Sequence, residues 1–400
     1  MTELSLGNGL VKQHVIDPEI CIRCNTCEAT CPVGAVTHDD RNYVVDAEKC
    51  NGCLDCIGPC PTGSIDNWRV VAKAYTLEDQ FSWDELPVQA DVGQAEIDAD
   101  ELQGEAGDLL RAAHAGGGGR AVPPASASKP VVGLFTRAKP AIATVQGNLR
   151  ITGAGTDSDV RHIVLSFGAT VFSVLEGQSI GILAPGLAPD GRPHAMRLYS
   201  IASSRDGEKR NANNVALTVK RNEGGVCSNY LCDLKVGDQV QVVGPFGATF
   251  LMPNDPGADI LMVCTGTGSA PFRAFTERRR RAAPGASGQL MMFFGARRPE
   301  ELPYFGPLQK VPETLLRKEL VYSRLPGRPK EHVQDRLRAR ADMVAALLHR
   351  GKAHIYICGL KGMEEGVDAA LSDICTLNGL DWAALKPQMR AEGRYHIETY

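Results

Sequence analysis

Short runs in which apolar and polar residues alternate dominate the chain from about residue 131 to residue 252. These runs are ATVQGNLRIT, RHIVLSFG, VFSVLEGQSIGILAP, NVALTVKR and DQVQVVGP, with Gly, Pro and Asp turns between them. Alternation with a period of two is typical of strands that bury one face. Their regular spacing predicts an antiparallel β-barrel, and we place this domain at residues 130–254.

After Pro253 the pattern changes to continuous apolar runs, most of them followed by a helical segment. The apolar runs are ADILMVC, LMMFFGA, LVYSR and HIYICG, and the helical segments are PFRAFTERRRRA, MVAALLHRG and GMEEGVDAALSDICTLNG. Alternating buried strands and helices are typical of a doubly wound parallel sheet. We therefore expect an α/β Rossmann-like domain at residues 255–400.

The first 78 residues contain an internal repeat. CIRCNTCEATCPVGAV, which starts at Cys21, and CNGCLDCIGPCPTGSI, which starts at Cys50, align without gaps on four cysteines, a proline, a glycine and an aliphatic end. HVIDPEI and NYVVDAEK around the repeats predict short strands. We expect a compact α+β module at residues 1–78, which makes the whole chain a multi-domain protein.

The repeat carries the candidate metal chemistry, because each copy reads C-x2-C-x2-C-x3-C-P. Its cysteines are Cys21, Cys24, Cys27, Cys31, Cys50, Cys53, Cys56 and Cys60. This is the bacterial two-cluster ferredoxin run, in which the fourth cysteine of each copy binds the cluster of the other copy. We therefore assign Cys60 to the first 4Fe-4S cluster and Cys31 to the second. Zinc is the alternative, but a tetrahedral site uses two pairs and would leave a third cysteine without a purpose.

Residues 79–129 differ in composition from both neighbours. DELPVQADVGQAEIDADELQGEAGD carries acids and no Lys or Arg, and a run of four glycines is followed by AVPPASASKP. Such a composition cannot bury a core, so we expect an acidic Gly/Pro-rich linker with a brief helix. A flexible linker of about 50 residues reaches roughly 40 Å. It would let the cluster module move between donor and acceptor, or would serve as a plain spacer.

The formal net charge of −4 hides an acidic N-terminal third and a basic remainder. An acidic electron carrier beside a basic reductase surface would dock with favourable potentials, although the charges would also suit plain solvated faces. No basic run carries interleaved aromatics, which argues against nucleic acid. We find no signal pattern and no membrane-spanning run, and we expect a cytoplasmic protein. The odd, scattered remaining cysteines fit a reducing compartment: Cys227, Cys232, Cys264, Cys358 and Cys375.

Several motifs of the C-terminal part resemble plant-type ferredoxin–NADP reductases: RLYSIASS, GGVCSNYLCDL, CTGTGSAPFR, YICGLKGMEEG and the terminal aromatic Tyr400. The resemblance covers about residues 131–400 and implies FAD and NADPH as cofactors. It implies that Arg197 neutralises the FAD pyrophosphate, Tyr199 packs on the isoalloxazine and Ser200 bonds near its N5. The implied FAD residues are Arg197, Leu198, Tyr199, Ser200, Thr218, Val219, Lys220, Val226, Cys227 and Ser228. RNEGG lacks the aromatic residue that stacks on the FAD adenine in this family.

The same resemblance implies an NADP site. Its residues would be Thr265, Gly266, Gly268, Ser323, Arg324, Lys330, Gly359 and Leu360. Glycine lets a pyrophosphate approach the backbone at a helix N-terminus. Ser323, Arg324 and Lys330 would grip the 2′-phosphate, which favours NADPH over NADH. His332 takes the position of the tyrosine that stacks on the NADP adenine.

The resemblance places the hydride chemistry on Ser200, Cys358, Glu398 and Tyr400. Cys358 would lie beside the nicotinamide C4 with Ser200 and Glu398, and Tyr400 would cover the flavin. On residue type alone, Cys358 is a small core residue and a terminal tyrosine is disordered. The other scattered cysteines of this part, Cys232, Cys264 and Cys375, are expected in the core.

The order of ferredoxin module, acidic linker and reductase is also similar to the reductase components of benzoyl-CoA 2,3-epoxidases. WRVVAKAYTLEDQFSWDELP resembles the same family. The resemblance implies that electrons pass from NADPH through FAD and two 4Fe-4S clusters to a di-iron oxygenase in aerobic benzoate degradation. Alternatives are a reductase that serves another acceptor or reduces NADP, and an electron carrier without catalysis. A homodimer is compatible with the sequence.

Overall fold

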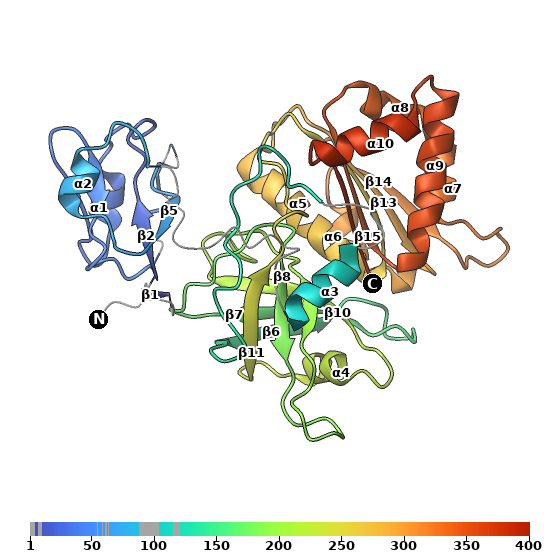
Figure 1. Ribbon diagram of the computed structural model, residues 1–400, viewed down its shortest axis with the longest axis horizontal. Coiled ribbons are helices and arrows are strands. Elements are labelled where there is room, and N and C mark those ends of the chain that lie inside the picture. Colours follow the sequence, from blue (N-terminus) through green and yellow to red (C-terminus); the bar gives the residue numbers. More distant parts are fainter. Residues whose placement is uncertain are drawn as a thin grey trace.

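The computed structural model describes residues 5–6, 10–53, 55–57, 59–60, 62, 64–87, 104–114 and 121–400. A small N-terminal body lies beside a β-barrel, and an α/β body adjoins the barrel on another side (Figure 1). The strand pairings confirm the predicted fold class of module, antiparallel barrel and parallel-sheet domain. No helix in these ranges is long and apolar enough to cross a bilayer.

The N-terminal module is built from two small sheets and two short helices. One sheet has the order β1-β2-β5 and the other pairs β3 with β4. Its elements are β1 (Ser5–Leu6), β2 (Leu10–Val15), α1 (Thr26–Thr30), β3 (Val36–His38), β4 (Tyr43–Val45), β5 (Asn67–Val71) and α2 (Leu77–Phe81). Ile16, Val36, Tyr43 and Ile65 pack with the cysteines in one apolar cluster. The cysteine-bearing loops therefore wrap the core of the module.

Helix α2 crosses the boundary that the sequence suggested at residue 78. The buried Gln80 side chain donates to the Val45 carbonyl at 2.9 Å and accepts from the Val45 N–H at 3.1 Å. Arg69 donates to the Pro87 carbonyl at 2.7 Å. Because these bonds tie the segment to β4 and β5, we place the end of the module near residue 87.

The barrel is a six-stranded antiparallel sheet in the order β10-β7-β6-β11-β8-β9. Its elements are β6 (Ala141–Arg150), β7 (Val160–Ser166), β8 (Ser179–Leu183), β9 (Arg197–Ser200), β10 (Asn214–Lys220), α4 (Val226–Asp233) and β11 (Gln239–Phe246). A bridge between Ile201 and Leu217 joins the two edges and closes the barrel. The first half of β6 alternates buried and exposed residues, as the sequence pattern predicts.

The C-terminal sheet is fully parallel, in the order β14-β13-β12-β15-β16. Its strands are β12 (Asp259–Thr265), β13 (Leu290–Ala296), β14 (Leu316–Tyr322), β15 (Ala353–Gly359) and β16 (Tyr395–Thr399). Its helices are α5 (Ser269–Ala282), α6 (Phe305–Gln309), α7 (Val333–Ala339), α8 (Ala341–His349), α9 (Glu364–Leu377) and α10 (Trp382–Ala391). The strand order reverses between β12 and β15, and ligands bind at such a switch point beyond the carboxyl ends of the strands.

Part of the expected linker is a helix on the reductase. Helix α3 (Glu105–His114) lies near the C-terminus in Figure 1, and its apolar side packs on the barrel. The acidic stretch at 88–103 and the glycines at 116–119 lie outside the described residues. The brief helix expected from the sequence thus exists.

Candidate active site

The module brings its cysteines together in two groups of four. Cys24 and Cys27 interact electrostatically with Cys60, and Cys27 also with Cys21. In the second group Cys56 interacts with Cys50, Cys53 and Cys31. This is the crossed arrangement that the repeat predicts, and the assignment of one cluster to each group stays a prediction.

The surroundings of these thiols suit iron-bound thiolates. Burial raises the pKa of Cys27 to about 11 and that of Cys56 to about 12, so bound metal is what would deprotonate them. Burial acts the same way on Cys60, but hydrogen bonds from Ser64 and its neighbours lower its pKa to about 7. No three His, Cys, Asp or Glu among the described residues could hold a single metal ion. Each group supplies the four thiols that a 4Fe-4S cubane binds, one at each iron.

A cavity of about 410 Å³ opens beside the barrel between β9 and α4. Arg197 and Tyr199 reach it from β9, whereas Cys227 and Ser228 reach it from the first turn of α4. Gly225 is the N-cap of α4, so the first backbone N–H groups of the helix have no capping side chain. A guanidinium, a helix N-terminus and an aromatic ring fit the pyrophosphate and the ring of FAD.

Not every residue expected around FAD lies at this cavity. The Thr218 hydroxyl bonds the Tyr304 hydroxyl at 2.6 Å, across the interface between the barrel and the α/β domain. Val219 is buried in the barrel core, and Lys220 is exposed at the end of β10. The structure therefore gives Thr218 a role in joining the two domains, which the sequence did not reveal.

Leu198 turns away from the cavity and packs near α3. Side chains alternate along a strand, so Leu198 and Ser200 share one face of β9, and Arg197 and Tyr199 share the other. Strand β9 thus presents one face to the cavity and the other face to the C-terminal strand β16.

The glycine loop after β12 lies at the switch point of the parallel sheet. Gly266 has a φ of +56°. A Cβ on Gly268 would stand 2.2 Å from the carbonyl oxygen of Cys358, so the loop can pass β15 only with glycine there. Thr265 accepts a hydrogen bond from the Leu360 N–H at 3.3 Å. Thr265, Gly266, Gly268, Gly359 and Leu360 are therefore neighbours, as a pyrophosphate and nicotinamide site requires.

Ser323, Arg324 and Lys330 follow the carboxyl end of β14, at the outer edge of the same sheet. The Ser323 and Arg324 N–H groups bond the ends of β13, at 3.1 Å to Ala296 and at 2.9 Å to Arg297. Neither Arg324 nor Lys330 forms an ion pair with another described residue, which leaves both cations free for a phosphate. His332 is the N-cap residue of α7, and its backbone N–H donates to the Asp335 carboxylate at 2.9 Å.

The expected hydride residues meet where the barrel touches β15 and β16. Cys358 and Glu398 are register partners on these strands. The Ser200 hydroxyl donates to Oε2 of Glu398 at 3.4 Å. Burial raises the pKa of Cys358 well above its usual value, so this thiol is not a nucleophile at neutral pH. Cys264 lies beside Cys358 on β12, and Cys232 and Cys375 are also buried.

The terminal Tyr400 is tied to the glycine loop. Its N–H donates to the Gly359 carbonyl at 3.0 Å, and its hydroxyl bonds the Thr267 hydroxyl at 2.5 Å. The residue remains 57% exposed. Tyr400 is therefore ordered beside the NADP loop, and its cover of the flavin stays a prediction.

A second side chain that the sequence analysis did not identify approaches the Glu398 carboxylate. Nε2 of His114, the last residue of α3, lies 3.6 Å from Oε1 of Glu398. The only signal was the spacing of Ala106, Leu109 and Leu110, which predicts one apolar helix face next to a histidine.

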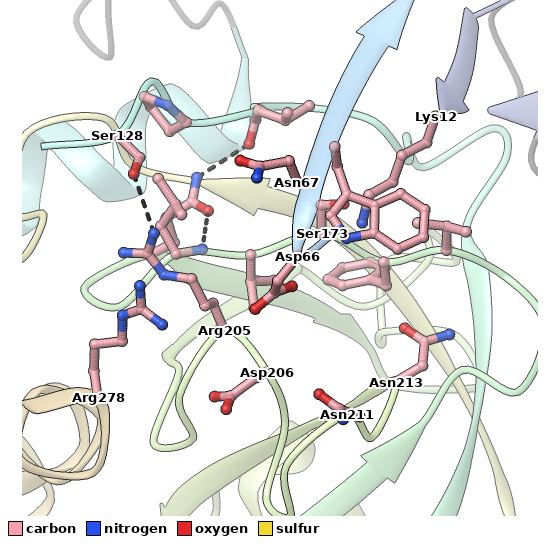
Figure 2. A pocket seen from close by; sticks show the side chains of 18 of the residues that line it. Lys12, Asp66, Asn67, Ser128, Ser173, Arg205, Asp206, Asn211, Asn213 and Arg278 are labelled. Carbon is pink, nitrogen blue, oxygen red and sulfur yellow. Dashed lines mark hydrogen bonds between the residues drawn. The ribbon is translucent and has the colours of Figure 1, made fainter. Parts of the chain in front are cut away.

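A cavity of about 830 Å³ separates the cluster module from the reductase. Figure 2 shows Lys12 and Asp66 of the module and Arg205 and Arg278 of the reductase around it. Val70 of β5 packs into the barrel cluster at one side of this cavity. Asp66 and Arg278 attract each other without direct contact. Val171 of the barrel domain in turn packs on the apolar cluster of the module. The module thus rests on the barrel through apolar contacts and opposite charges.

Comparison with protein-family models finds three matches along the chain. A 4Fe-4S dicluster domain matches residues 20–64, an oxidoreductase FAD-binding domain matches 156–250, and an oxidoreductase NAD-binding domain matches 262–369. These matches support FAD, NADP and a 4Fe-4S domain in one chain. They follow the order of the three bodies in Figure 1.

Several similar proteins are ferredoxin–NADP reductases. The chain is 39% identical over 285 residues to the cyanelle ferredoxin–NADP reductase of Cyanophora paradoxa, which covers 67% of this chain and 78% of that protein. It is 37% identical over 292 residues to the ferredoxin–NADP reductase of Thermosynechococcus vestitus, covering 67% and 75%. The structure of the Plasmodium falciparum ferredoxin–NADP+ reductase, at 23% identity, matches 67% of this chain and 99% of its own with a TM-score of 0.54.

Proposed function

Because this chain belongs to the ferredoxin–NADP reductase family, we propose that it carries electrons from NADPH to a one-electron acceptor protein. The chain is an NADP-dependent flavin oxidoreductase with an iron–sulfur domain. Bound FAD accepts a hydride and releases its electrons singly, and each 4Fe-4S cluster carries one electron at a time. The fused module is then the chain's own first acceptor.

One observation supports this proposal above the others. Ser200 of the FAD strand, Cys358 of β15 and Glu398 of β16 meet between the cavity at α4 and the glycine loop of the NADP sheet. Arg197 and the start of α4 hold the FAD pyrophosphate, and Ser323, Arg324 and Lys330 hold the 2′-phosphate of NADPH. Cys358 is small and fully buried, so it shapes the nicotinamide site without reacting.

The proposed final acceptor is a di-iron oxygenase that epoxidises benzoyl-CoA. The support is the order of the domains and the segment after the second cysteine run, which resemble the reductase components of such systems. Cys24 and Cys53 are exposed, so each cluster would come close to the surface of the module, where a partner can take electrons. The alternative is electron flow towards NADP, the reaction for which the similar reductases are named.

Two experiments test the proposal. Anaerobic stopped-flow mixing with NADPH should bleach first the flavin and then the clusters, and iron, sulfide and flavin analysis should find about eight irons per flavin. No bleaching would leave only an electron carrier without catalysis. Adding a purified di-iron oxygenase and benzoyl-CoA should then raise oxygen uptake above the leak of the flavin. If it never does, the benzoyl-CoA assignment fails and the reverse direction gains support.

A further inference from the structure

Helix α3 is seated on the same strand that carries the FAD residues. Leu109 and Leu110 pack with Met196 and Leu198, which flank Arg197 on β9. The Glu105 carboxylate pairs with Arg137 at 3.2 Å near the start of the helix. Leu110 is 2% exposed, so the contact is a packed interface. The seat fixes the far end of α3 beside β16.

That far end carries His114, which extends a line of polar groups from the hydride site. Ser200 donates to Oε2 of Glu398, and Nε2 of His114 lies 3.6 Å from Oε1 of the same carboxylate. The side chains of His114 and Glu398 are 15% and 7% exposed. Nε2 of His114 has no hydrogen-bond partner among the described residues. Glu398 is thus almost closed to water, and His114 is the more exposed member of the pair.

The proposed reaction needs an exit for a proton. Oxidation of NADPH by two one-electron acceptors yields NADP+, two reduced acceptors and one proton, because a hydride is two electrons and a proton. Electrons leave the flavin through the clusters, but the proton must leave the buried site by another route. Ser200 can pass the proton to the Glu398 carboxylate, but α3 covers this carboxylate.

We propose that His114 is the proton carrier between Glu398 and the protein surface. This role rests on the proposed function. A proton passes from Oε1–H of Glu398 to Nε2 of His114, and the proton on Nδ1 then passes to water. One N–H bond forms as one O–H bond breaks, and no redox change occurs at these residues. Imidazole suits this role because it carries one donor and one acceptor nitrogen at neutral pH.

The other groups around His114 do not replace it. Across a small cavity lie Tyr395 and His396 of β16, Arg390 of α10, and Thr249 and Phe250 after the barrel. Burial raises the pKa of Tyr395 above its usual value, so this phenol keeps its proton. Burial lowers the pKa of His396 to about 3, and its Nε2–H donates to the Gly393 carbonyl at 2.8 Å. His396 therefore stays neutral, and the Arg390 guanidinium keeps its proton.

The test compares His114→Gln with His349→Gln, a change at the exposed end of α8. In both variants the flavin should bleach anaerobically with NADPH at the wild-type rate, because the hydride step needs no proton exit. The later bleaching of the clusters should slow in His114→Gln only, because electrons that leave the flavin also release its proton. Steady-state reduction of cytochrome c should fall about 100-fold in His114→Gln only. Added imidazole should restore much of that loss, and the solvent deuterium isotope effect should rise in this variant.

A measurement without cofactor turnover tests the contact itself. In the oxidised holoprotein at one fixed pH, diethylpyrocarbonate should label His114 several-fold faster in Glu398→Gln than in wild type, because the charged group that approaches Nε2 is lost. Equal labelling, or equal cytochrome c reduction with normal bleaching, would overturn the role of His114 and leave the proposed function standing. A loss that imidazole does not restore would mean a structural role only. Failure of the wild type to bleach would overturn the proposed function instead.

Discussion

The sharpest prediction concerns Gly268, where the NADP loop passes the end of β15. In Gly268→Ala the new Cβ would meet the carbonyl oxygen of Cys358 at 2.2 Å, its carbonyl carbon at 2.5 Å and the Gly359 nitrogen at 2.7 Å. All three neighbours are backbone atoms, so the loop and β15 must separate by roughly 1 Å to reach ordinary van der Waals contact. Both the nicotinamide pocket and the pyrophosphate loop would open as a result.

We expect this change to destabilise the α/β domain by about 1–3 kcal/mol, the usual range for overpacking. That loss corresponds to a Tm lower by roughly 5 °C. A 1 Å displacement at the reacting centre costs about 10²-fold in rate, so kcat/KM for NADPH should fall by about that factor. The assays are calorimetry of the purified holoprotein and NADPH-dependent reduction of ferricyanide. Binding of FAD should be unchanged, because its cavity lies on the barrel.

The matched control is Gly362→Ala, since a Cβ at Gly362 meets nothing within 4 Å and its φ is not in the left-handed region. This variant should resemble wild type in both assays. If Gly268→Ala were as stable and as active as Gly362→Ala, then the close passage of the loop past Cys358 would not exist in solution. The assignment of Gly266 and Gly268 to the pyrophosphate would lose its structural basis.

Two of the three further predictions use the interfaces between the bodies, and the third uses a buried contact inside the cluster module. Burial favours the neutral form of Glu208, but His162 and Arg273 lower its pKa to about 2. The stability that this carboxylate contributes is therefore present above pH 4.5 and lost as the pH falls towards 2. Glu208→Gln should remove roughly 2 kcal/mol of this pH dependence, measured by thermal unfolding at several pH values. Val70→Lys should undock the module and raise the radius of gyration in X-ray scattering, whereas Val33→Lys, at an exposed position, should not. Gln80→Ala leaves both backbone groups of Val45 without a partner and should cost about 1–3 kcal/mol in denaturant unfolding, unlike the exposed Gln309→Ala.

Patterns within one segment were enough to predict most of the fold. The alternation in ATVQGNLRIT predicts a strand with one buried face, and this segment is a strand of the barrel. The apolar run ADILMVC predicts a strand buried on both faces, and this segment is a buried strand of the parallel sheet. The grouping of Cys60 with the first cysteine run and of Cys31 with the second also followed from the spacing of the repeat, whereas the clusters themselves stay a prediction. In these cases the local sequence and the tertiary structure agree.

Contacts between distant segments could not be predicted. Thr218 turned out to face Tyr304 of the other domain, because a strand residue's neighbour depends on how the domains pack. The link between His114 and Glu398 joins a linker of low hydrophobicity to the last strand, and no periodicity marks such a pair. The boundary at residue 78 failed to include Gln80 because a buried glutamine reads as a surface residue in a polar segment.

The seat of α3 also limits how far the module can travel. Residues up to Pro87 are bonded to the module and α3 is packed on the barrel, so only the 16 residues from 88 to 103 join them. Whatever its conformation, such a segment spans at most about 55 Å. The tether is therefore about a third as long as the expected linker of residues 79–129, and its greatest span falls in the same proportion. A longer excursion requires α3 to leave its seat, and this would also break the contact between His114 and Glu398. Module travel and proton exit are thus coupled through one helix: the proposed relay operates only while the module stays within the short tether.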